Sequence, residues 1–219
     1  MHIPVRIAHR RSAALLALAA LLWAAPALYA QEQKPIQLPK PEISAGMPLM
    51  QALARRQTTR AFLDKPLPPQ TLSNLLWAAF GVNRSRDVKP GLGRTAPSAM
   101  NKQEVELDVV LAQGVYVYDA EANLLRPVVA GDLRAKMGAP PAGQAAVTLV
   151  YVAGANLDYA QVDVGFIGQN VYLFAASEGL NAWFYALPGQ QDATTVAAAL
   201  KLPAQKRPLY AQSVGYPPK

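Results

Sequence analysis

The strongest constraint on the fold is the stretch DVGFIGQNVYLFAASEGL, which runs from Asp163 to Leu180. It predicts one helix that begins at Asp163 and ends at Gly179, because apolar side chains recur on nearly every face and glycine commonly follows the last helical residue. Such a helix is a buried spine that other elements must cover. It is not a membrane span, since Gln169 and Glu178 interrupt it and a span needs roughly 20 apolar residues.

Small residues in the predicted spine helix, Gly165 and Gly168 among them, allow another backbone to approach closely. That neighbour is either a helix of the same chain or the same helix of a second copy, and both possibilities stay open here. An aromatic strand, NAWFYA at Asn181–Ala186, follows directly. We expect a bound ligand near this junction; the alternative is a core helix that leads into a core strand.

Residues 1–30 have the pattern of a signal peptide. Three arginines precede an apolar run from Ala13 to Ala25, and small residues continue to Ala30. Removing this leader lowers Lys and Arg from 21 to 18 against 14 Asp and Glu, so the net charge falls from +7 to +4. We therefore expect a periplasmic or secreted protein, and the pair Arg10 and Arg11 leaves the export route open between the general and the twin-arginine pathway.

The mature chain has neither histidine nor cysteine, since His2 and His9 lie in the leader and cysteine is absent. This excludes Ser-His-Asp and Cys-His nucleophilic sites, and it excludes zinc sites built from Cys and His. No metal site is expected, and no side chain is singled out as a general acid or base. A bound cofactor is then the best candidate to carry any chemistry.

Residues 31–46 form a proline-rich arm, either a tether or a strap across a partner, and residues 47–219 form one domain. Helical and strand patterns mix in this domain without regular βαβ repetition, so the fold class is α+β. We expect further helices at 47–56, 70–80, 131–137 and 192–200, and strands at 104–111, 115–118, 124–129, 146–152 and 208–214.

Two polar clusters have residue types that bind ligands. In RRQTTR at 55–60, guanidinium forks and short hydroxyls suit a phosphate, although the cations also suit the negative end of a helix. In APSAMNKQ at 96–103, small residues let backbone amides approach a ligand, although Ser98 also suits a helix N-cap.

Four segments are informative through their order and spacing: RRQTTRAF at 55–62, NLLWAAFGVNR at 74–84, RTAPSAMNKQE at 94–104 and FIGQNVYLFAASEGL at 166–180. Together they resemble the flavin-dependent nitroreductase superfamily, over residues 47–217. The likeness is greatest to its small exported members and to the dehydrogenases that oxidise azoline rings in peptides. It implies a mostly antiparallel central sheet flanked by helices, in an intertwined homodimer that binds FMN at the subunit interface.

The resemblance also implies three groups of site residues. The first group would hold the flavin phosphate and ribityl chain, the second would come from the partner subunit, and the third would end the strand beside the flavin ring, with an N–H near Ala186 facing N5. In that order the groups are Arg56, Gln57, Thr58 and Arg60; Pro97, Ser98, Ala99 and Asn101; and Tyr185, Ala186 and Leu187.

The sequence departs from the family pattern in three places. Gln57 replaces a basic residue or histidine, and the stretch 186–188 lacks the small or acidic residues often found beside the ring. The chain also ends at Lys219, where many relatives continue into a tail with a Lys-x-Arg phosphate clamp. FMN affinity is more open to question than the fold.

The resemblance implies an exported FMN oxidoreductase that works by two half-reactions through flavin N5, with small molecules as electron donor and acceptor. The alternative is a flavin-free periplasmic binding protein that keeps the dimeric fold. We expect a donor other than NADH or NADPH, because those nucleotides are not maintained outside the cytoplasm and Gly91-Leu92-Gly93 is an incomplete dinucleotide fingerprint. Nothing in the sequence indicates nucleic-acid binding.

Overall fold

The computed structural model describes residue 2 and residues 33–84, 93–138, 140–154, 157–187 and 193–219. The chain divides into two units, Met1–Glu32 and Gln33–Lys219, and the second contains all the described secondary structure. Among the described residues, no helix is long and apolar enough to cross a membrane.

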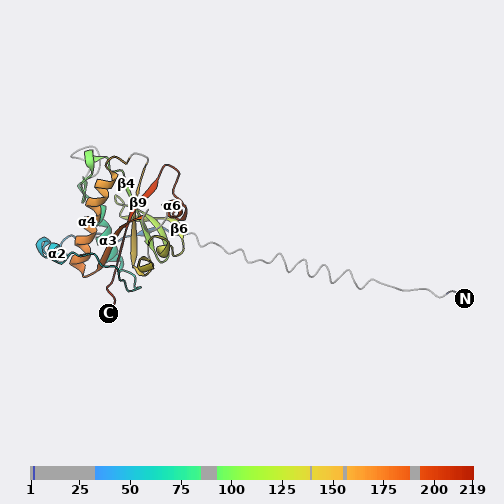
Figure 1. The fold of residues 1–219 in the computed structure, drawn as a ribbon, viewed down its shortest axis with the longest axis horizontal. Coiled ribbons are helices and arrows are strands. Elements are labelled where there is room, and N and C mark those ends of the chain that lie inside the picture. Colours follow the sequence, from blue (N-terminus) through green and yellow to red (C-terminus); the bar gives the residue numbers. More distant parts are fainter. Residues whose placement is uncertain (1, 3–32, 85–92, 139, 155–156, 188–192) are drawn as a thin grey trace. The chain divides into compact units, whose positions relative to one another are not determined.

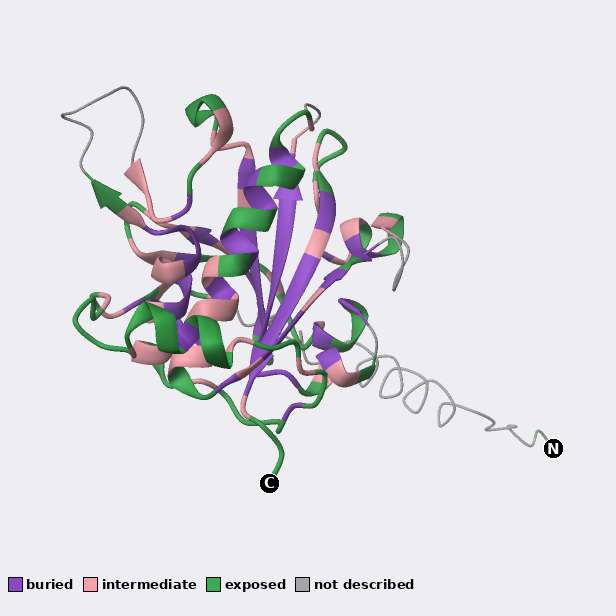
Figure 2. Cartoon of the chain, turned by 60° about the vertical axis from the view of Figure 1, so that its left-hand side comes forward, coloured by how far each residue is buried: buried purple, intermediate pink, exposed green. Residues whose placement is uncertain are grey.

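Seven described strands form one antiparallel sheet in the order β1-β6-β5-β4-β7-β9-β8 (Figure 1). The central strands β4 and β7 are rich in Val and Leu and are buried on both faces, as a covered sheet requires (Figure 2). The strands are β1 (Ile36–Gln37), β4 (Val105–Leu111), β5 (Gly114–Asp119), β6 (Leu124–Ala130), β7 (Val147–Ala153), β8 (Asn181–Ala186) and β9 (Arg207–Gly215), with β2 (Val82–Arg84) and β3 (Gly93–Arg94) in a separate hairpin.

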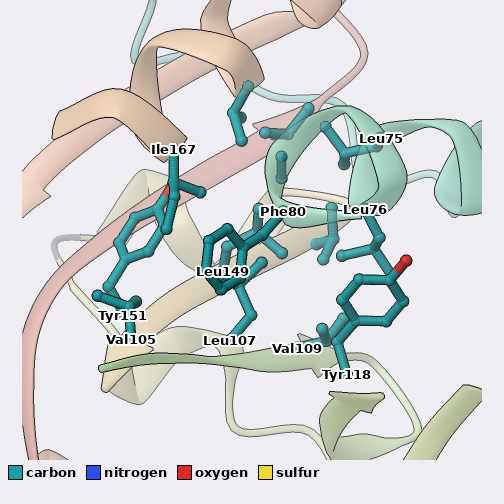
Figure 3. Close-up of a cluster of buried hydrophobic side chains, with 14 of the residues drawn as sticks. Leu75, Leu76, Phe80, Val105, Leu107, Val109, Tyr118, Leu149, Tyr151 and Ile167 are labelled. Atoms are coloured by element: carbon teal, nitrogen blue, oxygen red, sulfur yellow. The ribbon is translucent and has the colours of Figure 1, made fainter. Parts of the chain in front are cut away.

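Helices cover both faces of the sheet. Helices α3 and α4 pack beside each other on one face, where Ile167 of α4 and Leu76 of α3 point toward the side chains of the strands (Figure 3). A second core on the other face includes Val196 from α6. The helices are α2 (Leu49–Arg55), α3 (Pro69–Phe80), α4 (Ala160–Glu178) and α6 (Ala193–Ala199), with short 3-10 turns η2 (Ala99–Asn101), η3 (Arg134–Lys136) and η4 (Pro140–Gln144). The predicted α+β class is therefore confirmed.

The predicted spine helix exists, but it differs from the prediction in two respects. It begins at Ala160 instead of Asp163, and it ends as expected at Gly179, whose φ of 68° is left-handed. Its buried residues lie on the face toward the sheet, whereas the single chain leaves Val162 52% and Phe166 42% exposed. The helix is thus half covered by its own chain.

The two glycines of α4 have different surroundings. A Cβ at Gly168 would lie 3.0 Å from the Phe184 ring, so this glycine lets α4 approach β8 of the same chain. A Cβ at Gly165 would meet nothing within 4 Å. A neighbouring element of the same chain therefore explains Gly168 but not Gly165.

The proline-rich arm packs on its own domain. Its strand β1 pairs with β6, and Leu38 is buried. The side-chain amide of Asn123 donates to the carbonyl of Pro39 at 2.7 Å, and the N–H of Met47 donates to Ser177 Oγ at 2.8 Å. The arm therefore straps the sheet edge to α4 of the same chain.

One predicted element has a different form. The expected helix at 131–137 is only the 3-10 turn η3. Gly81 follows α3 with an extended backbone of φ −70° and ψ 165°, and space requires a glycine there, because a Cβ would lie 2.4 Å from the Trp77 side chain. Asp192, the first residue of the helix expected at 192–200, lies outside the described residues.

Candidate functional site

The free edge of β8 is the centre of the candidate site. In an antiparallel strand, alternate residues direct their N–H and C=O groups to opposite neighbours. The N–H of Ala182 donates to Thr59 Oγ1 at 3.2 Å and that of Phe184 donates to the Tyr172 hydroxyl at 2.9 Å, so both point away from β9. By the same alternation the N–H of Ala186 points to this edge, where no described residue accepts it.

The predicted phosphate-binding segment runs along this edge. The N–H of Thr59 donates to the carbonyl of Ala182 at 2.9 Å. The guanidinium of Arg56 lies 5.4 Å from the centre of the Tyr172 ring, and that of Arg60 lies 5.6 Å from the centre of the Trp183 ring. Neither guanidinium is paired with a described acid. Aromatic rings of α4 and β8 therefore hold two uncompensated cations at the strand edge.

Gln57 faces a cavity of about 390 Å³ between this segment and the C-terminal half of α4. The structure thus groups Gln57 with Arg55, whereas Arg56 and Arg60 lie over aromatic rings. The cavity is lined by Arg55, Gln57, Thr59, Tyr172, Ala175, Ala176, Gly179, Leu180 and Asn181.

The second predicted cluster is fixed at the opposite end of α4. The buried Asp163 carboxylate accepts a hydrogen bond from Ser98 Oγ at 2.7 Å and another from the N–H of Ala99 at 2.9 Å. Just beyond, Met100 and Asn101 have φ of 52° and 55°, which non-glycine residues rarely adopt. Backbone strain of this kind persists only where surrounding contacts hold it, and it is frequent at ligand sites.

The two clusters do not meet within one chain. Asp163 and Tyr172 are nine residues apart on α4, which is about 13 Å along a helix axis, and Gly179 is about 10 Å further on. The loop 97–101 is thus attached to one end of the helix and the segment 56–60 to the other half. Met100, on that loop, is 78% exposed.

The third predicted group contributes backbone only. Tyr185 and Leu187 are buried in the second core, where the Tyr185 hydroxyl donates to the carbonyl of Met137 at 2.7 Å. Burial raises the pKa of Tyr185 to about 12, so this phenol stays protonated at neutral pH. Ala186, between them, is exposed.

Sequence reasoning missed two residues that organise the site, Tyr172 and Asp163. Tyr172 lies within the apolar run VYLFAA, where its ring suited a core position, and Asp163 suited a helix cap. The sequence did contain a signal for both residues. Each places one polar group at a helix position that faces the core or the strand edge.

The comparisons with known proteins agree with this architecture. The nitroreductase family model matches residues 53–216. A candidate nitroreductase of Methanocaldococcus jannaschii is 30% identical over 164 residues, which cover 66% of this chain and 80% of that protein. The chain therefore belongs to the nitroreductase family, a family of oxidoreductases.

Solved structures extend the likeness to three dimensions. A candidate nitroreductase from Ralstonia eutropha is 34% identical, with a TM-score of 0.77 over 85% of this chain and 91% of that chain. An FMN-dependent nitroreductase from Clostridium difficile is 18% identical, with a TM-score of 0.52 over 78% of this chain and 88% of that chain. The second likeness concerns the fold alone.

Within the described ranges, no group of three or more acidic residues could hold a metal ion.

Proposed function

We propose that the protein is an FMN-dependent oxidoreductase that binds its flavin against the free edge of β8. One observation carries the proposal: the outward N–H groups of Ala182 and Phe184 have acceptors, whereas that of Ala186 has none among the described residues. The donor set fits FMN, because the guanidiniums of Arg56 and Arg60 suit a phosphate and the N–H of Ala186 suits N5 of the ring.

The protein's residues would contribute position and electrostatics. FMN, when bound, supplies two-electron transfer at N5, in one half-reaction from a donor and in another to an acceptor. Arg56 and Arg60 neutralise the phosphate, and the N–H of Ala186 orients and polarises N5. No side chain is assigned as general acid or base, since residues 31–219 contain no His or Cys.

We further propose that two copies share each site. The loop 97–101 is bound to Asp163 at one end of α4, and the segment 56–60 lies beside Tyr172 in its other half. In this proposal, a flavin that contacts both clusters takes them from different subunits. The exposed apolar side chains of Val162 and Phe166 on α4 supply a surface for the second copy.

Because of the leader, we propose that the enzyme is exported, either to the periplasm or out of the cell. Its electron donor would be a quinol, a redox protein or the substrate itself. The resemblance in sequence to azoline-oxidising dehydrogenases, as far as it extends to this chain, would imply the last of these.

The alternative, a flavin-free binding protein, is favoured by one observation. Lys206, a cation that could otherwise help to hold a phosphate, is already paired with Glu106 at 2.8 Å. Purification in the presence of FMN separates the two functions. We expect a yellow protein with a flavin spectrum, and a colourless protein that fails to bind added FMN would refute the enzyme.

A paired substitution tests the phosphate site in the same experiment. Arg60→Ala should weaken FMN binding by roughly 1.5 to 3 kcal/mol, the size of a charge-assisted hydrogen bond. Arg84→Ala, on the hairpin strand β2, removes the same charge from an exposed position and should leave affinity unchanged. Equal FMN affinities for the two variants would show that the segment 55–60 is a solvated helix end and not a phosphate site.

A further inference from the structure

Tyr172 joins three parts of the candidate site. Its hydroxyl lies 2.9 Å from Thr58 Oγ1 and accepts the N–H of Phe184 at 2.9 Å. Its ring lies under the guanidinium of Arg56 and also lines the 390 Å³ cavity. The residue is placed by α4, but its polar contacts are with the segment 56–60 and with β8.

We infer that the Tyr172 and Thr58 hydroxyls form one donor for a phosphate oxygen of the bound flavin nucleotide, and that Tyr172 also positions the edge of β8 that faces the ring. This inference rests on the proposed function. Its new element is Tyr172, for which neither the composition of the site nor the resemblance to the family gave a role, whereas the resemblance already implies a flavin contact for Thr58.

The proton count supports the donor. A phenol and a threonine hydroxyl carry one proton each. The hydrogen bond between them uses one of the two protons, whichever oxygen donates, and the N–H of Phe184 brings its own. One hydroxyl proton of the pair is therefore always left for a third atom. Thr58 is exposed, so that atom is water or a ligand.

The surrounding charge selects an anionic acceptor. Arg56 lies over the Tyr172 ring, and Arg55 and Gln57 line the cavity next to it. No described acid pairs with either arginine. A phosphate oxygen can accept from the hydroxyl pair and from a guanidinium at the same time, and hydrogen bonds to such an ion are stronger than those to a neutral oxygen.

The bond to Phe184 connects this donor to the strand edge. Phe184 is two residues before Ala186 on β8, and both direct their N–H groups to the same side of the strand. Without the Tyr172 hydroxyl, the N–H of Phe184 loses its acceptor, and the edge that carries the N–H of Ala186 loses a hydrogen bond to α4. A bound flavin ring should sense this loss.

The test uses Tyr172→Phe, which keeps the ring under Arg56 and removes only the hydroxyl. Tyr216→Phe is the matched control: its ring lies under the ammonium of Lys65 at 4.5 Å, and no described residue bonds its hydroxyl. Affinities for FMN and for riboflavin, which lacks the phosphate, are measured by flavin fluorescence, together with the absorption spectrum and the reduction potential of the bound flavin.

We expect the double variant Tyr172→Phe/Thr58→Val to weaken FMN binding roughly tenfold or more and riboflavin binding much less, because only FMN offers the charged acceptor. Each single variant should cost less FMN affinity than the double variant, since the hydroxyl that remains keeps its own proton to donate. The flavin spectrum and potential should shift in Tyr172→Phe and stay unchanged in Tyr216→Phe.

Three outcomes would overturn the inference. Unchanged FMN affinity in the double variant removes the donor, equal losses of FMN and riboflavin affinity remove its assignment to the phosphate, and an unshifted spectrum and potential in Tyr172→Phe remove the positioning of β8. Failure of the wild-type chain and Tyr216→Phe to bind FMN is a different result, because it refutes the proposed function itself.

Discussion

Asp108 lies on the face of β4 that is turned away from α4, and it is only 1% exposed. Neither of its carboxylate oxygens has a described hydrogen-bond partner. The pKa of Asp108 is raised to about 7, chiefly by burial and also by the Glu106 carboxylate, while the Lys206 ammonium opposes the rise. A carboxyl group in this position folds most favourably in its protonated form.

This pKa predicts how stability changes with pH. Because the folded pKa exceeds the unfolded value near 4, the contribution of Asp108 is complete below pH 4 and is lost as the pH rises through 7. The cost above pH 7 is about 4 kcal/mol, from three pKa units. Asp108→Asn removes the charge, so denaturant titrations should show it gaining stability over the wild type between pH 4 and 7 and levelling off above.

Asp119 on β5 gives a control of opposite sign. Hydrogen bonds from the N–H of Ala122 and from Arg126 hold the pKa of Asp119 below its ordinary value. Its contribution to stability is therefore present above the unfolded pKa and lost as the pH falls through the folded pKa, so Asp119→Asn should lose stability relative to the wild type as the pH rises towards 4 and show a constant difference above it. Equal pH slopes for the two variants would contradict the assignment for Asp108.

At the scale of the elements, the described part of the proline-rich arm, residues 33–46, should stabilise the domain on which it packs. Leu38 is 4% exposed in the core beneath α3, whereas Ile43, on the same arm, is 73% exposed. Leu38→Ala should cost about 2 to 4 kcal/mol of unfolding free energy through lost burial and a residual cavity. Ile43→Ala should stay within about 0.5 kcal/mol. Similar midpoints for both variants in urea would show that the arm is not bound in solution.

The sequence predicted those elements whose pattern is local. The apolar runs of β4 and β7 and the glycine end of α4 gave their positions to within a few residues, because burial and backbone geometry act at each residue separately. The expected helix at 131–137 was not found. There, buried Arg134 bonds the side chains of Asp132 and Asp64 and the carbonyl of Ala145, and these contacts fix a loop.

The residue types of the candidate site could be predicted from the sequence, but the contacts between them could not. Both polar clusters were visible as residue types in the sequence. Their anchors were not, because Thr58 and Tyr172 are 114 residues apart and Ser98 and Asp163 are 65 apart. Pairings at such separations arise from the tertiary fold, which a single sequence does not reveal.

At the scale of the whole molecule, the proposed shared site predicts that dimerisation and flavin binding fail together. Phe166→Asp places a charge on the exposed face of α4, where a second copy would have to desolvate it. We expect light scattering at micromolar concentration to report a dimer for the wild type and a monomer without flavin for the variant. Val128→Asp, at another partly exposed apolar position on β6, should remain dimeric and yellow. A monomer that retains FMN would refute the shared site.

The proposed export of the enzyme predicts its electron donor. Nicotinamide nucleotides are not maintained as a pool outside the cytoplasm, and the described part of the fold shows no dinucleotide fingerprint to compensate. Gly93 pairs with Arg84 in the hairpin of β2 and β3, so GLG at 91–93 ends in a strand and not at the start of a helix, as phosphate binding of that type requires. Anaerobic mixing of the FMN-loaded protein with NADH or NADPH should therefore bleach the flavin slowly and without saturation. A quinol or the true substrate should reduce it faster, and rapid, saturable bleaching by micromolar nucleotide would show that the compartment does not determine the donor.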